Sequence, residues 1–283
     1  MKFYIVIPAH NEADCIGLTL NSLVNQSLLP SKIVVVDDNS SDETSEIVKS
    51  FALKYDFLAF IKTTSSDLHL PGAKIINAFN KGLQNLDDNY DVICKFDADL
   101  IFPENYLEQL SFHFNSNKKL GMAAGFCYIE KDGNWILENL TNKDHIRGAL
   151  KAYRKECFKE IGQLKSSIGW DTIDELLAKY YKWELKTDET LHVKHLKPTG
   201  ASYNKKSKYL QGEAFYKMRY GFLITLITAL KMSYKKKKLV ILFDYSIGYF
   251  KAMFGSTKPL ITKDQGKFVR KLRWKGMFNK FSY

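Results

Sequence analysis

The sequence predicts an α/β fold, with a mostly parallel sheet covered by helices on both faces and a basic helical extension at the C-terminal end. In the first half of the chain, short and continuously apolar segments alternate with helix-like segments. Strands that are apolar on both faces are typical of parallel sheets buried between helices. Two of these apolar segments end in pairs of aspartates, and the charge of the chain changes sign near residue 200.

The expected elements follow from these patterns in chain order. Strands are expected over residues 3–7, 32–36, 58–61 and 92–96, and helices over 16–24, from 41 onward, over 72–86 and over 103–114. The helix from residue 41 begins with a serine and two acidic residues, which favour a helix N-terminus. Beyond residue 121 the pattern weakens, and only a strand over 122–129, a helix over 173–183 and a strand over 191–196 are expected.

The charge distribution divides the 283-residue chain into two parts. Residues 1–199 carry a net charge of −5 and residues 200–283 a net charge of +16, which gives +11 overall. We therefore expect an acidic α/β domain over 1–200 and a basic, partly amphipathic helical region over 201–283 with a role of its own. The acidic part suits a site that holds a divalent cation.

The four cysteines are scattered and form no C-x-x-C pair. This spacing indicates neither a disulfide framework nor a zinc cluster, and it favours the reducing environment of the cytoplasm.

Acidic residues follow two of the apolar segments. Asp97 and Asp99 flank a small residue after the segment 92–96, so both carboxylates are expected to face one space. Hard oxygen ligands of this kind bind Mg²⁺ or Mn²⁺, although a lone D-x-D also occurs as a capped turn. Asp37 and Asp38 follow the segment 32–36, where a carboxylate could accept a hydrogen bond from a uracil imide or a ribose hydroxyl.

Together these motifs resemble family 2 glycosyltransferases, whose fold is the Rossmann-like GT-A fold. Ile7-Pro8-Ala9-His10-Asn11-Glu12 resembles the opening P-x-Y-N-E of the family, with His10 in place of the usual Tyr. Val36-Asp37-Asp38-Asn39-Ser40-Ser41-Asp42 resembles V-D-D-x-S-x-D, residues 72–82 resemble the G-x-x-x-A-x-N-x-G helix, and Asp97-Ala98-Asp99 resembles D-x-D. The resemblance covers roughly residues 1–200.

The resemblance implies roles for individual positions. Asp99 is expected to bind the metal, Asp97 to reach the ribose or the metal, and His195 to lie near the metal or the diphosphate, with a structural role as the alternative. Asp38, or else Asp37, is expected to contact the base. The positions that match the nucleotide-binding motifs of the family are Pro8, His10, Glu12, Asp38, Lys74 and Asp97.

The general base is expected at the start of a helix. In the family it is commonly an aspartate in a G-x-D or E-D motif, and Gly169-Trp170-Asp171 stands at the corresponding place, although the E-D pair is not intact. We favour Asp171 as the base, with Asp174 as the alternative. Asp171 could also be only a helix N-cap.

The resemblance implies an inverting glycosyltransferase that uses Mn²⁺ or Mg²⁺. The favoured donor is a UDP-sugar, with guanosine and thymidine diphosphate sugars as alternatives. The acceptor would be a glycan or a lipid-linked sugar in the synthesis of cell-envelope polysaccharides or glycoconjugates. A catalytically inactive relative that binds nucleotides or glycans is an alternative. The glycine-rich loops of sugar nucleotidyltransferases and of Rossmann oxidoreductases do not follow the first strand.

The basic region suggests a membrane partner. Between residues 219 and 254, apolar stretches alternate with lysines, and Lys235–Lys238 form a run of four. No stretch reaches the ~18–20 residues that span a bilayer. Short apolar helices beside lysines and aromatic residues suit a peripheral position at the inner, anionic face of the membrane. The alternatives are a helical subdomain with a solvated lysine face and a nucleic-acid-binding protein, but the latter leaves the acidic domain unexplained, so we expect no nucleic-acid partner.

Overall fold

The computed structural model describes residues 1–64, 72–138, 142–197 and 208–278. The chain forms two compact units. The first comprises Met1–Ser166 and Tyr181–Ala201, and the second comprises Ser167–Tyr180 and Ser202–Tyr283. The second unit therefore includes a helical segment that precedes the last strand of the first. The domain boundary expected between residues 200 and 201 falls outside the described residues.

A nine-stranded sheet forms the centre of the first unit. Its strands in chain order are β1 (Phe3–Ala9), β2 (Lys32–Asp38), β3 (Leu58–Thr63), β4 (Val92–Phe96), β5 (Leu100–Ile101), β6 (Leu120–Lys131), β7 (Asn134–Leu137), β8 (Leu150–Arg154) and β9 (Glu184–His195). The spatial order is β3-β2-β1-β4-β8-β6-β9-β5, and β7 pairs with β6. The first four strands are parallel, and β8 runs antiparallel to both β4 and β6.

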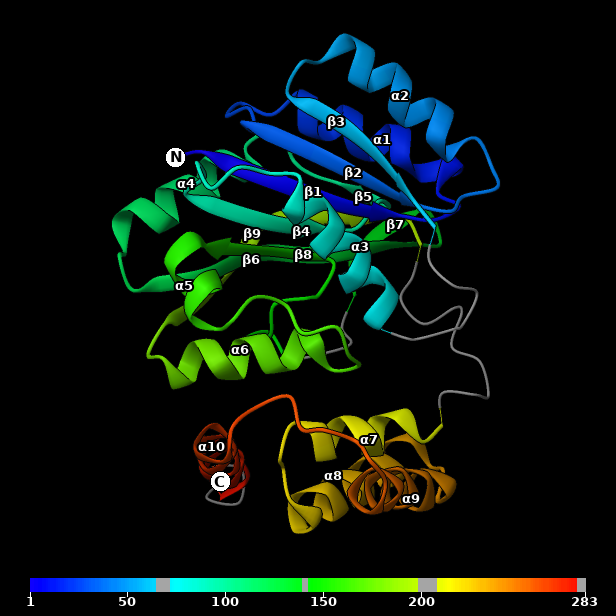
Figure 1. Cartoon of the computed structure of the whole chain (residues 1–283), viewed down its shortest axis with the longest axis vertical. Coiled ribbons are helices and arrows are strands. Elements are labelled where there is room, and N and C mark those ends of the chain that lie inside the picture. Colours follow the sequence, from blue (N-terminus) through cyan, green and yellow to red (C-terminus); the bar gives the residue numbers. More distant parts are fainter. Residues whose placement is uncertain (65–71, 139–141, 198–207, 279–283) are drawn as a thin grey trace. The chain divides into compact units, whose positions relative to one another are not determined.

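Helices cover both faces of this sheet. They are α1 (Ala13–Val24), α2 (Thr44–Lys54), α3 (Ala73–Gln84), α4 (Tyr106–Ser116) and α5 (Lys155–Glu160). Figure 1 shows α1 and α2 on one face and α3 and α5 on the other. Phe79 of α3 meets Phe158 of α5 edge to face, with ring centroids 6.1 Å apart. The apolar strand β1 and the apolar residues 33–36 of β2 are buried between these two layers.

The order of the parallel strands creates a switch point beside β1. The chain moves from β1 outward to β2 and β3, and then returns to β4 on the other side of β1. Because such crossovers are right-handed, this reversal places α3 on the face opposite α1 and α2. The connections that leave β1 and β4 diverge at the carboxyl ends of these strands, which is where ligands bind in open α/β sheets.

Strand β8 was not expected from the sequence because buried cations interrupt its apolar pattern. Arg154, at its end, is 8% exposed. Its guanidinium donates from Nε to the carbonyl of Leu120 and from Nη2 to the carbonyls of Phe114 and Asn117. Two of these carbonyls lie at the C-terminal end of α4, where a cation is favourable. The charge of Arg154 is thus satisfied by backbone oxygens that are distant in sequence.

The second unit is helical, with α6 (Trp170–Tyr180), α7 (Leu210–Lys217), α8 (Phe222–Lys236), α9 (Val240–Phe254) and α10 (Lys263–Phe278). Helices α7 and α9 approach closely at two glycines. A Cβ on Gly212 would lie 2.0 Å from the carbonyl oxygen of Tyr245, and one on Gly248 would lie 2.1 Å from that of Tyr209. In the part of the chain that the structure describes, no helix combines the length and the apolar character that a membrane span requires.

The predicted fold class is confirmed, including the parallel strands, the helices on both faces and the helical C-terminal part. Some element predictions were wrong. β9 begins at Glu184 rather than at 191, because its first half is polar and partly exposed. Helix α6 spans 170–180 rather than 173–183. The sequence predicted neither the short elements β5, β7 and α5 nor β8.

The tight contact between α3 and the sheet gives a test of packing. A Cβ on Gly82 of α3 would lie 2.4 Å from Val6 Cγ1 and 2.9 Å from Val36 Cγ2, whereas a Cβ on Gly17 of α1 would meet nothing nearer than 3.7 Å. We expect Gly82→Ala to destabilise the protein by about 1–3 kcal/mol. The control Gly17→Ala should be neutral or stabilise it by up to about 1 kcal/mol. Urea denaturation of both variants would measure the difference, and equal effects would contradict the packing.

Candidate active site

A cavity of about 320 Å³ opens at the switch point of the first unit. It lies at the carboxyl ends of β1, β2 and β4 and beside the start of α3. Every residue predicted to bind the nucleotide lines it, and so does Asp99. The lining residues are Pro8, Ala9, His10, Glu12, Asp38, Asn39, Lys74, Ile75, Ala78, Asp97, Ala98 and Asp99.

Hydrogen bonds between the loops after β1 and β2 build one wall of this cavity. His10 Nδ1 lies 2.6 Å from the carbonyl oxygen of Asp38. Because a carbonyl only accepts hydrogen bonds, Nδ1 carries a proton. The backbone N–H of Asn11 donates to Ser40 Oγ at 2.9 Å, and Asn11 Oδ1 accepts from the backbone N–H of Ser41 at 2.8 Å. These contacts hold His10 and Asp38 against each other at the cavity.

Asp42 joins the same two loops at the starts of two helices. Its carboxylate accepts from the backbone N–H of Ala13 at 3.1 Å and from the backbone N–H and the hydroxyl of Thr44 at 3.1 and 2.5 Å. Burial alone would raise the pKa of Asp42, but these hydrogen bonds outweigh it and lower the pKa. Asp42 therefore accepts hydrogen bonds from the backbone N–H groups of the first residues of both α1 and α2.

The structure separates the roles of the two adjacent aspartates. Asp37 is fully buried, and its carboxylate accepts hydrogen bonds from the backbone N–H of Ser40 at 3.0 Å and from the hydroxyl of Ser45. It does not line the cavity, whereas Asp38 does. Of the two predicted candidates for the base contact, Asp38 is thus the one that the structure brings to the cavity.

The turn after β4 is held in place by two side chains, Thr19 and Lys95, for which the sequence predicted no role. Thr19 of α1 donates to the carbonyl of Ala98 at 2.7 Å and accepts from the N–H of Leu100 at 3.0 Å. Lys95, 1% exposed, pairs with Asp97 Oδ1 and donates to the carbonyl of Gly148 at 3.1 Å. A lysine inside an otherwise apolar strand requires a buried partner, and this is the signal that could have identified it.

Negative charge concentrates in the cavity. Burial raises the pKa of Glu12, and the nearby carboxylates of Asp99 and Asp97 raise it further, whereas Lys197 lowers it. Lys197 Nζ lies 2.6 Å from Glu12 Oε2. Like charges in one pocket favour either a proton or a bound cation. Oxygen ligands gathered in this way fit Mg²⁺ or Mn²⁺.

His195 lies against Asp99 because the short strand β5 pairs with β9. The register places Leu100 opposite His195, and the N–H of Leu196 donates to the carbonyl of Asp99 at 2.9 Å. His195 Nε2 is 3.4 Å from Asp99 Oδ2, and His195 Nδ1 is 3.0 Å from Glu138 Oε2. His195 is not one of the residues that line the cavity. The sequence predicted its proximity to the metal motif but gave no indication of Glu138.

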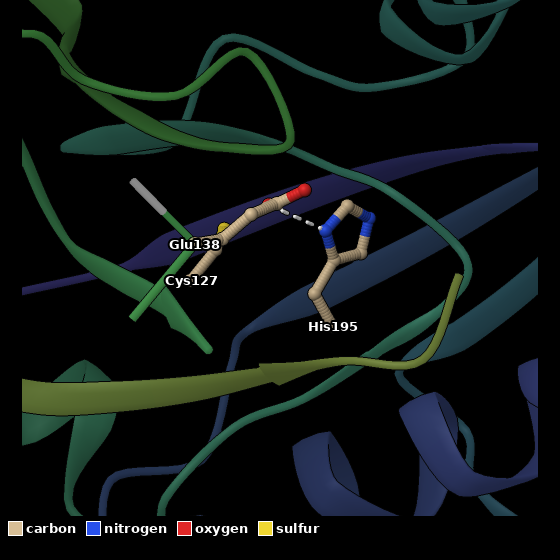
Figure 2. A group of neighbouring side chains, drawn as sticks. All are labelled: Cys127, Glu138 and His195. Atoms are coloured by element: carbon tan, nitrogen blue, oxygen red, sulfur yellow. Dashed lines mark hydrogen bonds and ion pairs between the residues drawn. The ribbon is translucent and has the colours of Figure 1, made fainter. Parts of the chain in front are cut away.

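Figure 2 shows the side chains of Cys127, Glu138 and His195, whose donor atoms lie within 4.8 Å of one another. Such a trio could in principle hold a metal ion. However, Arg147 Nη2 lies 3.0 Å from Glu138 and would repel a cation, and burial raises the pKa of the Cys127 thiol to about 12. We therefore interpret the group as support for His195. A chain of contacts runs from Arg147 through Glu138 and His195 to Asp99.

The two candidate bases lie on the same helix. Asp171 and Asp174 are on α6, which belongs to the second unit, and every cavity-lining residue belongs to the first. Asp171 is half-buried, whereas Asp174 is 2% exposed and accepts a hydrogen bond from the backbone N–H of Glu175 at 2.7 Å. The assignment of the general base to Asp171 or Asp174 stays a prediction.

The environment of His195 gives a pH-dependent prediction. Burial alone would lower its pKa, but the hydrogen bonds and charges of Asp99 and Glu138 outweigh burial and raise the pKa to about 9. The proton on His195 therefore stabilises the metal-free fold fully below pH 6.5, its ordinary pKa, and this contribution is lost as the pH rises through about 9. NMR titration of the metal-free protein should show a protonated ring at neutral pH. Glu138→Gln should lower this pKa, and the exposed control Glu130→Gln should not.

Comparisons with known proteins agree with the described geometry. The chain matches the model of "Glycosyl transferase family 2" over residues 4–164. It is 33% identical to "Probable glycosyltransferase YdaM" of Bacillus subtilis over 147 residues, which are 51% of this chain and 34% of that protein. It is 25% identical to a poly-beta-1,6-N-acetyl-D-glucosamine synthase of Staphylococcus epidermidis over 201 residues, 64% of this chain and 45% of that protein. The chain thus spans less than half the length of these two relatives.

Solved structures share the fold. The structure of S. aureus TarS 1-349 in complex with UDP-GlcNAc aligns with a TM-score of 0.58 at 16% identity. The alignment covers 95% of this chain and 78% of the TarS chain. A second structure is that of the mannosyltransferase PcManGT from Pyrobaculum calidifontis in complex with GDP-Man and Mn²⁺. Its TM-score is 0.56 at 13% identity, and the alignment covers 98% of this chain and 80% of the PcManGT chain. The residues matched by the family model make up more than half of the chain and include every residue that lines the cavity. The chain therefore belongs to glycosyl transferase family 2 and has the GT-A fold.

Proposed function

We propose that the chain transfers a sugar from a nucleotide diphosphate donor to an acceptor hydroxyl, with inversion at the anomeric carbon. One observation carries this proposal: a single cavity is lined by all the residues predicted to bind the nucleotide and by both aspartates of the D-x-D motif. A volume of about 320 Å³ is within the range of small-molecule sites.

The base and ribose would bind at the loops after β1 and β2. In this proposal Asp38 accepts from the base, and His10, fixed through Nδ1 by the carbonyl of Asp38, forms the adjacent wall. Lys74 at the start of α3 is a cation that approaches the base or the diphosphate. A UDP-sugar is the favoured donor, and the fold neighbour solved with UDP-GlcNAc supports it. The neighbour solved with GDP-Man keeps a guanosine donor as the alternative.

Asp99 and Asp97 would hold the divalent cation, with His195 as a further ligand. The fit rests on the donor set: carboxylate oxygens and an imidazole nitrogen suit Mn²⁺, and the clustered carboxylates favour a cation between them. A fold neighbour solved with Mn²⁺ supports this assignment. When bound, the cation would neutralise the negative charge of the departing diphosphate. Glu138 would keep the His195 ring turned toward Asp99, as outer partners of metal-binding histidines do.

Asp171 would take the proton of the acceptor hydroxyl. A general base must reach the acceptor, and the half-buried Asp171 is better suited to this than Asp174, which is 2% exposed and bonded to the backbone of its own helix. Such proton transfers contribute roughly 10²–10⁴-fold to a rate.

The acceptor would be a glycan or a lipid-linked sugar in the synthesis of envelope polysaccharide or glycoconjugate. The similarity to a poly-beta-1,6-N-acetyl-D-glucosamine synthase supports this class. An enzyme on the cytoplasmic side of a membrane, bound peripherally at its inner face, would meet lipid-linked acceptors there. A relative that binds nucleotides without transferring sugar is the second candidate, and the experiments below separate it from an enzyme.

Calorimetry with UDP, GDP and their sugars tests the donor and the metal. We expect one nucleotide to bind only when Mn²⁺ or Mg²⁺ is present, because a cation held by Asp97 and Asp99 would offset the repulsion between these carboxylates and the diphosphate. Asp99→Asn should abolish metal-dependent binding and reduce turnover on the order of 1000-fold, or about 4 kcal/mol in activation free energy. The exposed Asp14→Asn on α1 is the matched control. Full activity of Asp99→Asn would overturn the metal assignment.

Kinetics of two variants of α6 test the base. Asp171→Asn should lower kcat by roughly 10²–10⁴-fold while the affinity for the donor stays unchanged, because the base acts on the acceptor. Asp174→Asn should affect stability more than kcat, since Asp174 is buried. The opposite pattern would assign the base to Asp174. Donor binding without any transfer in the wild type, across glycan and lipid-linked acceptors, would favour the inactive relative.

A further inference from the structure

Exposed apolar side chains concentrate on one helical hairpin. Among the described residues, sixteen large apolar side chains are exposed, and ten of these lie between Phe222 and Phe254. This segment contains α8 and α9, which are joined by the short loop Lys237–Leu239. Single exposed apolar residues are ordinary, but a contiguous group marks an interaction surface.

These side chains form a stripe on each helix. On α9, Val240, Phe243, Ile247 and Phe254 follow the spacing that places residues on one face of a helix, and their exposed fractions range from 39% to 82%. On α8, Leu223, Leu230 and Tyr234 share one face in the same way, with exposed fractions of 58%, 49% and 89%. Both helices of the hairpin therefore leave an apolar face in contact with solvent.

The loop of the hairpin is fixed rather than frayed. Ser233 Oγ donates to the carbonyl of Lys238 at 3.1 Å and accepts from the N–H of Leu242 at 3.0 Å. Lys237 ends α8 in the left-handed conformation, with φ of 51°. At the opposite end, Phe222 of α8 packs on Phe250 of α9, with ring centroids 4.6 Å apart. The apolar stripes and the loop are thus parts of one built element.

Lysines accompany these stripes, and most of them lie at the loop of the hairpin. Residues 222–254 contain six lysines and one acidic residue, Asp244. The four consecutive lysines Lys235–Lys238 are exposed, and they lie between the exposed Tyr234 and Leu239. The single acid is 3.9 Å from Lys208 and is 15% exposed, so it offsets little of the charge at the loop. The surface therefore combines exposed apolar side chains with a surplus of cations.

We propose that the α8–α9 hairpin lays its apolar stripes on an anionic lipid surface, with Lys235–Lys238 at the headgroups. Helices with apolar stripes and flanking lysines lie in the interface, where the apolar face enters the headgroup boundary by about 5–10 Å. Each helix is 15 residues long and does not span a bilayer. A second copy of the chain fits less well, because lysines are depleted from the cores of protein interfaces.

Flotation of the full chain with vesicles tests this proposal. We expect the protein to float with vesicles of phosphatidylglycerol and phosphatidylcholine at low ionic strength, and not with phosphatidylcholine alone. High salt should weaken the binding, because it screens exposed charges. The triple variant Lys235→Gln/Lys236→Gln/Lys238→Gln should lose affinity on the order of 100-fold. Lys237 is left unchanged because of its left-handed backbone.

A second variant tests the apolar contribution. Leu239→Ser/Phe243→Ser removes two side chains that are 77% and 62% exposed, so the fold should be kept while vesicle binding falls at least tenfold. The matched controls lie in the first unit: Leu53→Ser/Phe112→Ser, 89% and 63% exposed, and Lys118→Gln/Lys119→Gln. They should bind vesicles like the wild type. Nucleotide binding should be the same for all variants, which separates this test from that of the enzyme.

Three results would overturn the proposal. The wild type could ignore anionic vesicles at low ionic strength, or the hairpin variants could float as well as the wild type. Sedimentation could also show a wild-type dimer that the Leu239→Ser/Phe243→Ser variant converts to a monomer without any vesicle binding, which would assign the surface to a second copy of the chain.

Discussion

The concentration of carboxylates at the carboxyl ends of β1 and β4 is the constraint on which the rest of the site depends. Glu12, Asp97 and Asp99 share one cavity, and burial together with the charges of Asp99 and Asp97 raises the pKa of Glu12. Among the described residues, three cations pair directly with these carboxylates. Lys95 pairs with Asp97, Lys197 with Glu12, and a protonated His195 with Asp99.

These cations explain several features of the fold. Lys95 lies inside β4 and is 1% exposed, which is tolerable only with Asp97 and a backbone carbonyl as partners. His195 reaches Asp99 only because β9 returns beside β5, and Glu138 and Arg147 extend the same network away from the cavity. Removing one partner from such a network leaves another charge buried and unpaired. A divalent cation at Asp99 would replace part of this compensation.

The proposed functions are distributed over the two units. The first holds the cavity, and its residues account for donor and metal binding. The second carries Asp171 and the α8–α9 hairpin, so both the proposed base and the proposed membrane surface lie in one helical unit. A base and a lipid-facing surface in the same unit would be consistent with an acceptor that comes from the membrane, while the nucleotide donor comes from solution.

The sequence by itself determined the parallel α/β core and the residues of the cavity. Continuous apolar strands and acidic strand ends depend on local chemistry, so the amino-acid pattern alone places the Asp37-Asp38 pair, Asp97 and Asp99 at one edge of the sheet. Sequence motifs also placed Lys74 at the start of its helix. The resemblance to the family favoured Asp38 over Asp37, and the structure supplies the physical reason: the buried carboxylate of Asp37 accepts a hydrogen bond from Ser45.

Only the tertiary structure revealed the residues that support the site. Glu138, Arg147 and Lys197 act through partners that are distant in sequence, and no local pattern indicates them, whereas the lysine in the apolar strand β4 was the one local signal, for Lys95. β8 escaped prediction for the same reason, since Arg154 finds its acceptors in the backbone of α4 and the start of β6. Local sequence thus determines where strands and their polar ends lie. The pairing of buried charges is decided by which segments the fold brings together.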